Sequence, residues 1–475
     1  MAANYLHGVE TIEINRGSRP VQVVKSAVIA LTGIAPEGPV NEPTLVLSPT
    51  DAAQFGEKLP GFTIPQALDA IFKQGPATVI VVNTFSLSDN TADVELETHT
   101  IVDGKLKLNY AWVGDAPTIF ESDGITPADL EQDVDYTLDE YGNFRAISAA
   151  AADGTVLKFT YVRLEIGNVT DAQIIGEIEA GSPPARTGMK CLELVYTMFG
   201  FTPKIILCNG FSDHAPVATE MIAAANAYRG IALLDAPEGV TPSEAITGRG
   251  PAGTVGGFNT SSDRAYLLYP WVKVYDVATD SNINTTMSQF VAGVISKVDL
   301  NEGYWFSPSN HEITGLVGLE RLITAGINNP SSEANLLNEK GIATIFNSFG
   351  TGLRLWGNRS AAWPTTTEPK NFICVRRVAD ILHESVEYNM MQFIDKPIVP
   401  ATIDAIRETV NAFIRTLVQR GALVDGRCIY NPEKNPPEEI ALGHLTFDIE
   451  FMPPTPAERI TFESFIDINL LQALQ

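Results

Sequence analysis

With 475 residues, of which 45% are hydrophobic, the chain is long enough for roughly two to four domains, each with a core of its own. The 57 acidic and 32 basic residues give a formal net charge of −25, which argues against nucleic acid or an anionic lipid surface as a partner. No run of about 18 apolar residues is present, and residues 1–20 lack a signal-peptide pattern. The sequence therefore predicts folding in a cytoplasm without direct membrane insertion.

The first 19 residues form a short β-like segment that is isolated from the rest of the chain. Its apolar side chains fall on one parity, and the turn-forming residues of 15–20 separate it from the next strand-like segment. An unpaired strand exposes backbone N–H and C=O groups that attract another strand. We interpret 1–19 as an N-terminal arm that pairs through Val9, Glu10, Ile12 and Ile14.

Segments 20–86 and 171–364 alternate strand-like and helix-like patterns. The expected strands are 23–31, 44–47, 78–82, 204–208 and 231–234, and the expected helices are 64–73, 189–199 and 215–228. Alternation of this kind is typical of a three-layer α/β core around a mostly parallel sheet. We predict one discontinuous α/β domain made from both segments.

Residues 87–170, between these two segments, have a different character. Short β runs at 94–102, 105–112, 136–138 and 155–164 are separated by turns such as Asp103-Gly104 and Asp153-Gly154. The stretch holds 16 acidic and 5 basic side chains, a net −11 of the chain's −25. Such a charge density is easiest to accommodate in solvent, so we predict an acidic, outward-facing, all-β insertion domain.

The last part, 365–475, is predicted to be an α+β assembly domain. Helical patterns cover 372–393 and 402–419, and the second has an apolar stripe made of Ile403, Ile406, Val410, Phe413 and Leu417. In 445–451, apolar and polar residues alternate with the two-residue period of a strand that has one wet face. We predict that this antiparallel strand belongs to a sheet that accepts foreign strands, through Leu445, Phe447, Ile449 and Phe451.

A C-terminal arm, 457–475, follows that strand. Pro453, Pro454 and Pro456 cannot donate an N–H and so prevent the ladder from continuing. The last dozen residues could extend about 40 Å at roughly 3.3 Å per residue. The apolar side chains of this second alternating run are Ile460, Phe462, Ile466, Ile468 and Leu470. We predict that both arms add strands to neighbouring copies, and the pattern is equally compatible with pairing inside the same monomer.

One glycine-rich stretch has the spacing of a nucleotide-binding loop. Gly248, Gly250 and Gly253 match the start of G-x-G-x-x-G, but a dinucleotide site needs this loop directly after a strand and opening a helix. Here a helical turn at 241–246 precedes the loop and the strand-like 265–274 follows it. We interpret it as a glycine loop, with an α/β nucleotide-binding enzyme as the alternative.

Other chemistry-bearing residues form no recognisable site. The run Ser212-Asp213-His214 holds the residue types of a hydrolytic triad, but consecutive side chains seldom point at one another, and a helix start explains them better. The cysteines are far apart, without a C-x-x-C pair, and are interpreted as small buried side chains: Cys191, Cys208, Cys374 and Cys428. We expect no catalytic residue, cofactor or metal site, although catalytic groups can converge from distant positions.

The opening His7-Gly8-Val9-Glu10 and the segment 303–310 both match patterns of one family. They resemble the N-terminal arm and the G-x-W-x-S-P-S-N segment of the contractile tail sheath proteins of bacteriophages, R-type bacteriocins and contractile injection systems. Further similar segments are 352–359 (W-G-x-R-T, with Ser360 in place of threonine), 372–377 and 456–462. The insertion at 87–170 is not part of the shared core.

The resemblance implies a structural protein rather than an enzyme. Copies would stack as sixfold rings around a tail tube, first in an extended metastable state, and contraction would drive the tube through a target envelope. The implied partners are other copies, the tail tube, and baseplate and tail terminator proteins, with assembly in the bacterial cytoplasm. Another structural tail component is a further alternative.

The helical pattern at 402–419 also suggests a contact with the tube. Arginines lie on or near its polar side and could meet an acidic tube surface: Arg407, Arg415 and Arg420. Ordinary solvated helix charges explain them better, because cations near a helix C-terminus, as Arg415 and Arg420 are, are favoured by the helix dipole.

Overall fold

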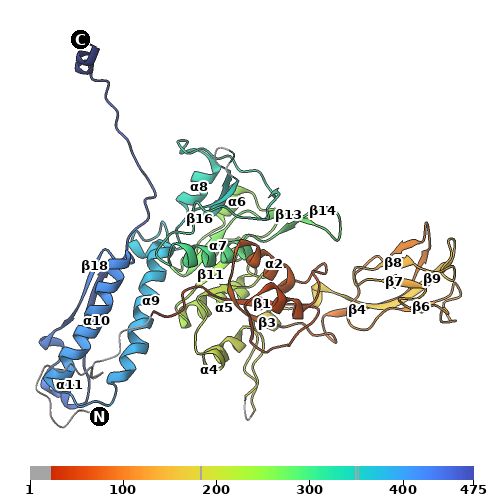
Figure 1. Cartoon of the computed structure of the whole chain (residues 1–475), viewed down its shortest axis with the longest axis horizontal. Coiled ribbons are helices and arrows are strands. Elements are labelled where there is room, and N and C mark those ends of the chain that lie inside the picture. Colours follow the sequence, from red (N-terminus) through yellow and green to blue (C-terminus); the bar gives the residue numbers. More distant parts are fainter. Residues whose placement is uncertain (1–22, 182–183, 348–349, 351, 475) are drawn as a thin grey trace, which may run out of the picture.

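The computed structural model describes residues 23–181, 184–347, 350 and 352–474. Three parts lie in a row (Figure 1). An eight-stranded sheet with its helices occupies the middle, the strands β4 to β9 lie at one end, and the helices α9 and α10 with strands β18 and β19 lie at the other.

The central sheet is mostly parallel, as the alternating pattern predicts. Its order is β17 (Leu353–Trp356), β16 (Ile342–Asn347), β12 (Ala265–Leu268), β11 (Ile231–Asp235), β10 (Ile205–Leu207), β1 (Val28–Gly33), β3 (Thr78–Asn83) and β2 (Thr44–Val46). Only the outermost strands β17 and β2 are antiparallel to their neighbours. The inner strands are covered on both faces, which explains their nearly continuous apolar sequences.

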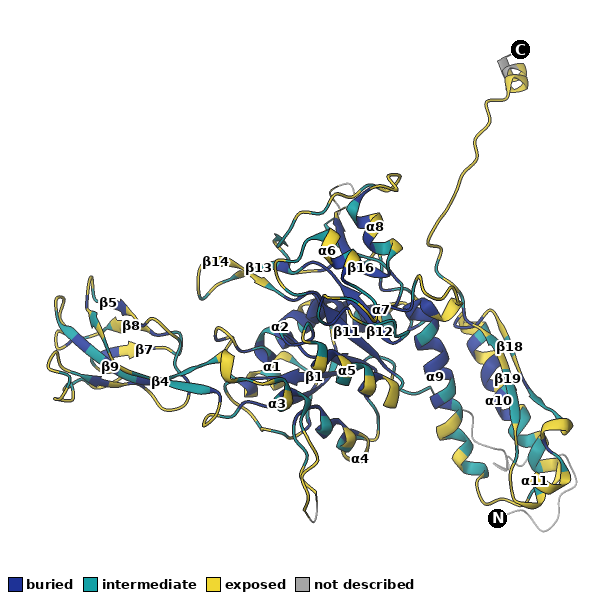
Figure 2. Ribbon diagram, turned by 180° about the vertical axis from the view of Figure 1, so that it is seen from behind, coloured by how far each residue is buried: buried dark blue, intermediate teal, exposed yellow. Residues whose placement is uncertain are grey.

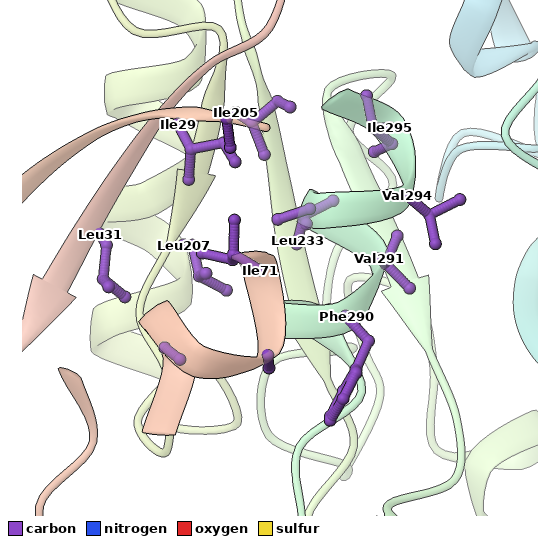
Figure 3. Packing of buried hydrophobic residues seen from close by; sticks show 14 of the residues in the cluster. Ile29, Leu31, Ile71, Ile205, Leu207, Leu233, Phe290, Val291, Val294 and Ile295 are labelled. Atoms are coloured by element: carbon purple, nitrogen blue, oxygen red, sulfur yellow. The ribbon is translucent and has the colours of Figure 1, made fainter. Parts of the chain in front are cut away.

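Helices cover both faces of this sheet. Because side chains alternate along a strand, Ile29, Leu31 and Leu233 point to one face, where they pack under α2 (Ile64–Gln74) and α7 (Ser288–Asn301) (Figure 3). Their sequence neighbours Ala30 and Leu234 point to the other face. That face is covered by α5 (Ala215–Ala227), the 3₁₀ helix η3 (Gly188–Leu194) and α4 (Val195–Phe199).

Shorter elements complete the middle part. Its other helices are α1 (Pro49–Ala52), η1 (Ala53–Phe55), η2 (Ile166–Asn168), α3 (Asp171–Ile175), α6 (Pro242–Thr247), α8 (Glu333–Glu339) and η4 (Pro369–Asn371). A small antiparallel sheet projects from it, with β13 (Val272–Asp276) between β14 (Ser281–Thr285) and β15 (Gly318–Leu319).

Three predicted elements of the middle part differ from the structure. The strand expected at 23–31 begins only at Val28, because Val23 and Val24 pack against the C-terminal part instead. The strand expected at 265–274 is split into β12 and β13 around Pro270, which has no N–H for a ladder. The helix expected at 189–199 is a 3₁₀ helix followed by a single α-helical segment.

The end part formed by β4 to β9 contains two three-stranded sheets. One holds β4 (Thr91–Thr100), β9 (Val156–Leu164) and β6 (Thr118–Phe120), and the other holds β5 (Lys105–Lys107), β8 (Asn143–Ala146) and β7 (Tyr136–Leu138). Tyr136 stacks on Phe144, and Phe159 meets Phe144 edge to face, so this part has its own core. The domain bounds 87–170 and the outward orientation in an assembly stay predictions.

The opposite end packs two long helices against a two-stranded sheet. The helices are α9 (Ile373–Met390), extended by η5 (Met391–Phe393), and α10 (Pro400–Arg420), and the strands are β18 (Asp425–Tyr430) and β19 (Phe447–Met452), joined through η6 (Pro432–Lys434) and α11 (Pro437–Ala441). Val410, Phe413 and Leu417 of the predicted apolar stripe are buried against α9. Ile403 and Ile406 of that stripe are only half-buried.

Helix α9 is fixed to the central sheet by buried ion pairs. Asp380 accepts two hydrogen bonds from Arg264, at 2.7 and 2.8 Å, and Arg377 donates to Asp299. Further pairs on the same helix are Arg376 with Asp263, Glu384 with Lys204, and Glu387 with Arg229. Arg264 and Lys204 directly precede β12 and β10, so α9 lies along the amino ends of the parallel strands.

A second buried charge lies at the carboxyl end of β11. Asp235 accepts hydrogen bonds from the hydroxyl of Ser212, at 2.9 Å, and from the backbone N–H of Ser288, also at 2.9 Å. Burial raises the pKa of Asp235 to about 6, and the nearby Asp213 carboxylate adds to this. The run Ser212-Asp213-His214 lies at the start of a helix, as predicted. Its last residue, His214, is the N-cap of α5.

Replacing Asp380 by Asn should destabilise the folded chain by about 3–5 kcal/mol, because the buried guanidinium of Arg264 loses its counter-charge and the partly buried Arg376 keeps only Asp263. Urea unfolding measures this. The matched control is Asp69→Asn, whose lysine partners are exposed and whose loss should cost less than about 1 kcal/mol. Equal effects of the two substitutions would contradict the assignment of the α9 ion pairs as the main attachment.

The variant Asp235→Asn should gain thermal stability relative to the parent chain as the pH rises from 4 to 7. In the parent chain, the pKa of the Asp235 carboxyl is higher in the folded state than in the unfolded state, so between about pH 4 and 6 the folded state binds more protons. As the pH rises through this window, the stability of the parent chain therefore falls by on the order of 2–3 kcal/mol. Differential scanning calorimetry at several pH values measures the difference in Tm. The exposed Asp123→Asn should show a flat difference over the same range, since hydrogen bonds from Thr126 lower the pKa of Asp123 to about 2.

Candidate assembly interface

The two-stranded sheet β18–β19 turns one face toward the helices and the other toward solvent. Phe447, Ile449 and Phe451 pack on the core of this part, and Phe451 meets the ring of His383 from α9 edge to face. Asp448 and Glu450, on the other parity, form ion pairs with Lys434 and Arg427. The predicted alternation of 445–451 is therefore confirmed for three of its four apolar residues.

Leu445 is the exception, because it precedes β19. The N–H and C=O of the next residue, Thr446, are bonded to the side-chain amide of Asn435, at 2.7 and 2.8 Å. This amide substitutes for a ladder partner, so the strand begins at Phe447.

The outer edges of the two strands differ. On β18, the amide of Asn411 from α10 accepts from the N–H of Cys428, at 2.8 Å, and donates to its C=O, at 3.0 Å. Along an antiparallel pair, the backbone N–H and C=O groups of successive residues point alternately toward the partner strand and away from it. Those of Cys428 point away from β19, so those of its register partner Ile449 point away from β18. The backbone groups of Phe447, Ile449 and Phe451 therefore lie on the outer edge of β19. In the described part of the chain, β18 is the only strand that pairs with β19.

The C-terminal arm leaves the body of the protein as an extended segment (Figure 1). No helix or strand is formed from Pro453 to Asp467. Large apolar side chains follow one another along it, each 68% exposed or more: Ile460, Phe462, Phe465, Ile466, Ile468 and Leu470. Figure 2 shows the same segment as continuously exposed beyond its root. A single chain leaves this apolar surface uncovered.

In the single chain the end of the arm is helical rather than extended, and the pairing of Ile468 and Leu470 with another copy stays a prediction. Both lie in the 3₁₀ helix η7 (Ile468–Leu474), where the N–H of Leu470 donates to the C=O of Asp467 at 3.2 Å. Without an adjacent strand, these backbone groups are satisfied by local i to i+3 bonds instead of a ladder.

The predicted N-terminal arm residues Val9, Glu10, Ile12 and Ile14 lie outside the described residues. The first described residues, Val23 and Val24, contact the core of the C-terminal part, and the N–H of Val24 donates to the hydroxyl of Ser385 on α9 at 3.3 Å. The described chain thus starts beside the same helices that carry the β18–β19 sheet.

The three arginines considered for a tube contact lie on α10, and Arg407 and Arg415 form ion pairs with neighbouring acidic residues. Arg407 contacts Asp404 at 3.1 Å and Glu408 at 3.4 Å, and Arg415 approaches Glu408 at 3.9 Å. Arg420 is the last residue of the helix and is exposed. All three side chains are at least partly exposed to solvent.

The carboxyl edge of the parallel sheet, where α/β proteins bind nucleotides, is closed by the chain's own side chains. Between β1 and β10, Asn209 donates to the C=O of Thr63 and to Gln289, and accepts from Thr286. The glycine loop follows α6 and leads to β12, as expected. Gly253 lies so close to its own loop that a Cβ would come within 2.0 Å of the Gly248 carbonyl oxygen.

Within the described residues, no cluster of three His, Cys, Asp or Glu side chains is arranged to hold a metal. No described helix has both the length and the apolar character needed to cross a bilayer. The four cysteines are free and buried, as predicted.

Sequence reasoning missed Asn411 and Asn435, the two amides that bond to strand backbones. The relevant hint is that Asn411 follows the buried Val410 directly inside a long helix, where asparagine is an unfavourable helix former. Such a residue is explained when its side chain serves a neighbouring backbone.

Comparison with known proteins gives a consistent picture. The family model described as the phage tail sheath protein central domain matches residues 185–361, and the one for the phage tail sheath C-terminal domain matches residues 365–467. The tail sheath protein of Burkholderia phage BcepMu is 45% identical over 100% of this chain and 99% of its own length. The tail sheath protein of Escherichia phage P2 is 23% identical over 99% and 98%.

Solved structures agree at the level of the fold. The contracted helical sheath of the anti-feeding prophage matches with a TM-score of 0.60 at 16% identity, covering 98% of this chain and 100% of that one. The contracted sheath of the extracellular contractile injection system PVC matches with a TM-score of 0.59 at 17% identity, covering 99% and 100%. Given the 45% identity along its whole length and the two matching family models, this chain belongs to the tail sheath protein family of contractile phage tails and related injection systems.

Proposed function

We propose that this sheath protein joins its copies into a lattice by exchanging both terminal arms, with the β19 edge as the acceptor. The observation that carries the proposal is the complementarity within one chain: the arm is apolar and exposed, and the outer edge of β19, beside an apolar core, is paired with no strand among the described residues. Adding a strand to a sheet edge satisfies the backbone groups of both partners.

The energies favour many arms acting together. Each net hydrogen bond contributes about 0.5–1.5 kcal/mol. Burying an Ile or Phe side chain such as Ile460 or Phe462 contributes about 1.5–3 kcal/mol. One arm therefore gains an amount comparable to the roughly 4–15 kcal/mol lost when two molecules associate. A lattice in which each subunit is held by several arms is stable where a single contact is marginal.

In this proposal the protein is a structural component without enzymatic activity. It assembles in the bacterial cytoplasm as sixfold rings around a tail tube, between baseplate and tail terminator proteins. The strand-paired arms keep the subunits connected while the contacts between the central domains change on contraction. By their turn-forming and proline residues, the linkers 15–20 and 453–456 are proposed to redirect the two arms toward neighbouring copies. The closed carboxyl edge of the central sheet supports a non-enzymatic role.

Charged residues on the apolar parity of the arm should abolish cylinder formation. Phe462→Asp with Ile466→Asp places two carboxylates where the arm meets an apolar core, whereas the control Thr461→Asp with Asn469→Asp adds the same charge on the other parity. We expect the first variant to stay in the supernatant and the control to form cylinders, as judged by sedimentation and negative-stain microscopy. Normal cylinders from chains lacking 1–14 or 460–475 would refute arm exchange.

The arginines Arg407, Arg415 and Arg420 on α10 are proposed to face an acidic tube. The double variant Arg407→Glu and Arg415→Glu should lower co-sedimentation with tubes about tenfold, equivalent to about 1.4 kcal/mol, and leave self-assembly intact. The control Lys105→Glu with Arg145→Glu makes the same change of charge on exposed residues of β5 and β8, at the far end of the molecule. Unchanged tube binding by the α10 variant would exclude this contact.

A further inference from the structure

One arginine of the central part has an unusually confined side chain. The Arg359 guanidinium carbon lies 3.9 Å from the centre of the Trp363 ring and 4.0 Å from that of Phe372. Stacking between two aromatic faces fixes a guanidinium in one plane, with its N–H groups directed at the rim of the stack. Only 14% of the side chain is exposed.

The group at that rim is the first carboxylate of the C-terminal arm. Nε of Arg359 donates to both oxygens of Glu458, at 3.1 and 3.2 Å, and Nη2 also donates to Oε2. A fork of this kind holds a carboxylate in a defined direction, unlike a single point contact. Glu458 is separated from Arg359 by 99 residues along the chain, so the bond ties the arm to the central part.

The position of this bond divides the arm into a held and a free section. Upstream, Pro453 is buried and the prolines stiffen the link after β19. Downstream, the exposed apolar residues begin two positions later, at Ile460. The free section is therefore the section proposed to enter a neighbouring sheet.

We propose that Arg359 is a positioning residue that clamps the arm at Glu458 and directs its free section away from the β19 edge of its own subunit. The inference rests on the proposed exchange of arms. The clamp leaves this edge and the free section of the arm available for another copy.

The clamp also raises the local concentration of the free arm at its target. A tether that starts at Glu458 samples a smaller volume than one that starts at Met452, and effective concentration falls as a flexible tether lengthens beyond the span it must reach. Releasing the clamp should therefore slow assembly, even though no contact between subunits is removed.

The test is limited proteolysis of the full-length chain kept dilute and monomeric. Trypsin cleaves after Arg459, next to the clamp, and mass spectrometry follows that one bond. Because about 1 kcal/mol corresponds to roughly a fivefold change, we expect Glu458→Gln and Arg359→Lys to be cleaved there about five times faster than the parent chain. Glu463→Gln, the same change further along the arm, should behave like the parent.

Two references separate the clamp from other effects. A peptide of residues 453–467 with and without Glu458→Gln gives the effect of sequence on trypsin itself, and Arg359→Lys leaves the cleaved sequence unchanged. Near-ultraviolet circular dichroism shows whether Arg359→Lys remains folded, and Glu458→Gln alters only a partly exposed side chain.

Faster cleavage together with slower cylinder formation by both variants supports the clamp. The clamp proposal is overturned if both variants are cleaved at the parental rate once the effect of the substitution on the peptide is subtracted. It is also overturned if cleavage is faster and the rate of cylinder formation is unchanged. The proposed arm exchange is judged separately by the chain lacking 460–475, whose failure or success to form cylinders does not depend on Arg359.

Discussion

Backbone N–H and C=O groups at the edge of a sheet need partners, and this requirement governs the C-terminal part of the chain. Within the described residues the β18–β19 sheet has two strands, fewer than a sheet usually needs for stability in water, and its apolar face packs on α9 and α10. A foreign strand on β19 would both complete the ladder and cover the adjacent core. In the proposed lattice, the exposed arm would find in another subunit the neighbouring strand that the described part of its own chain does not supply.

Helix α9 connects this assembly part with the central sheet. Its buried ion pairs reach the residues that precede β10 and β12, so the helix and the parallel sheet are held in one orientation. In the proposed lattice, a movement of the central part would therefore be transmitted through α9 to the acceptor sheet. The section of the arm beyond Glu458 is not held in this way and would allow a neighbouring subunit to rotate.

The sequence reveals those features that depend on local periodicity. The alternation in 447–451 and the apolar stripe of Val410, Phe413 and Leu417 could be recognised because residues spaced by the strand or helix period lie on the same face. The ion pair between Arg264 and Asp380 could not, because 116 residues separate the partners. Val23 and Val24 read as the start of a strand, yet they pack on α9. The helix η7 was missed for a different reason: the strand pattern of Ile468 and Leu470 describes a pairing that one chain alone does not make.

The amide of Asn411 has a consequence for the geometry of any lattice built from this chain. By occupying the backbone of Cys428, it blocks the middle of the outer edge of β18, so a further strand would join the sheet at β19. A sheet that is open on both sides could propagate without limit, as fibrils do. With one open edge, the sheet of each subunit accepts strands on one side and in one direction. This limits the number of neighbours of each subunit, which distinguishes a closed cylinder from an indefinite aggregate.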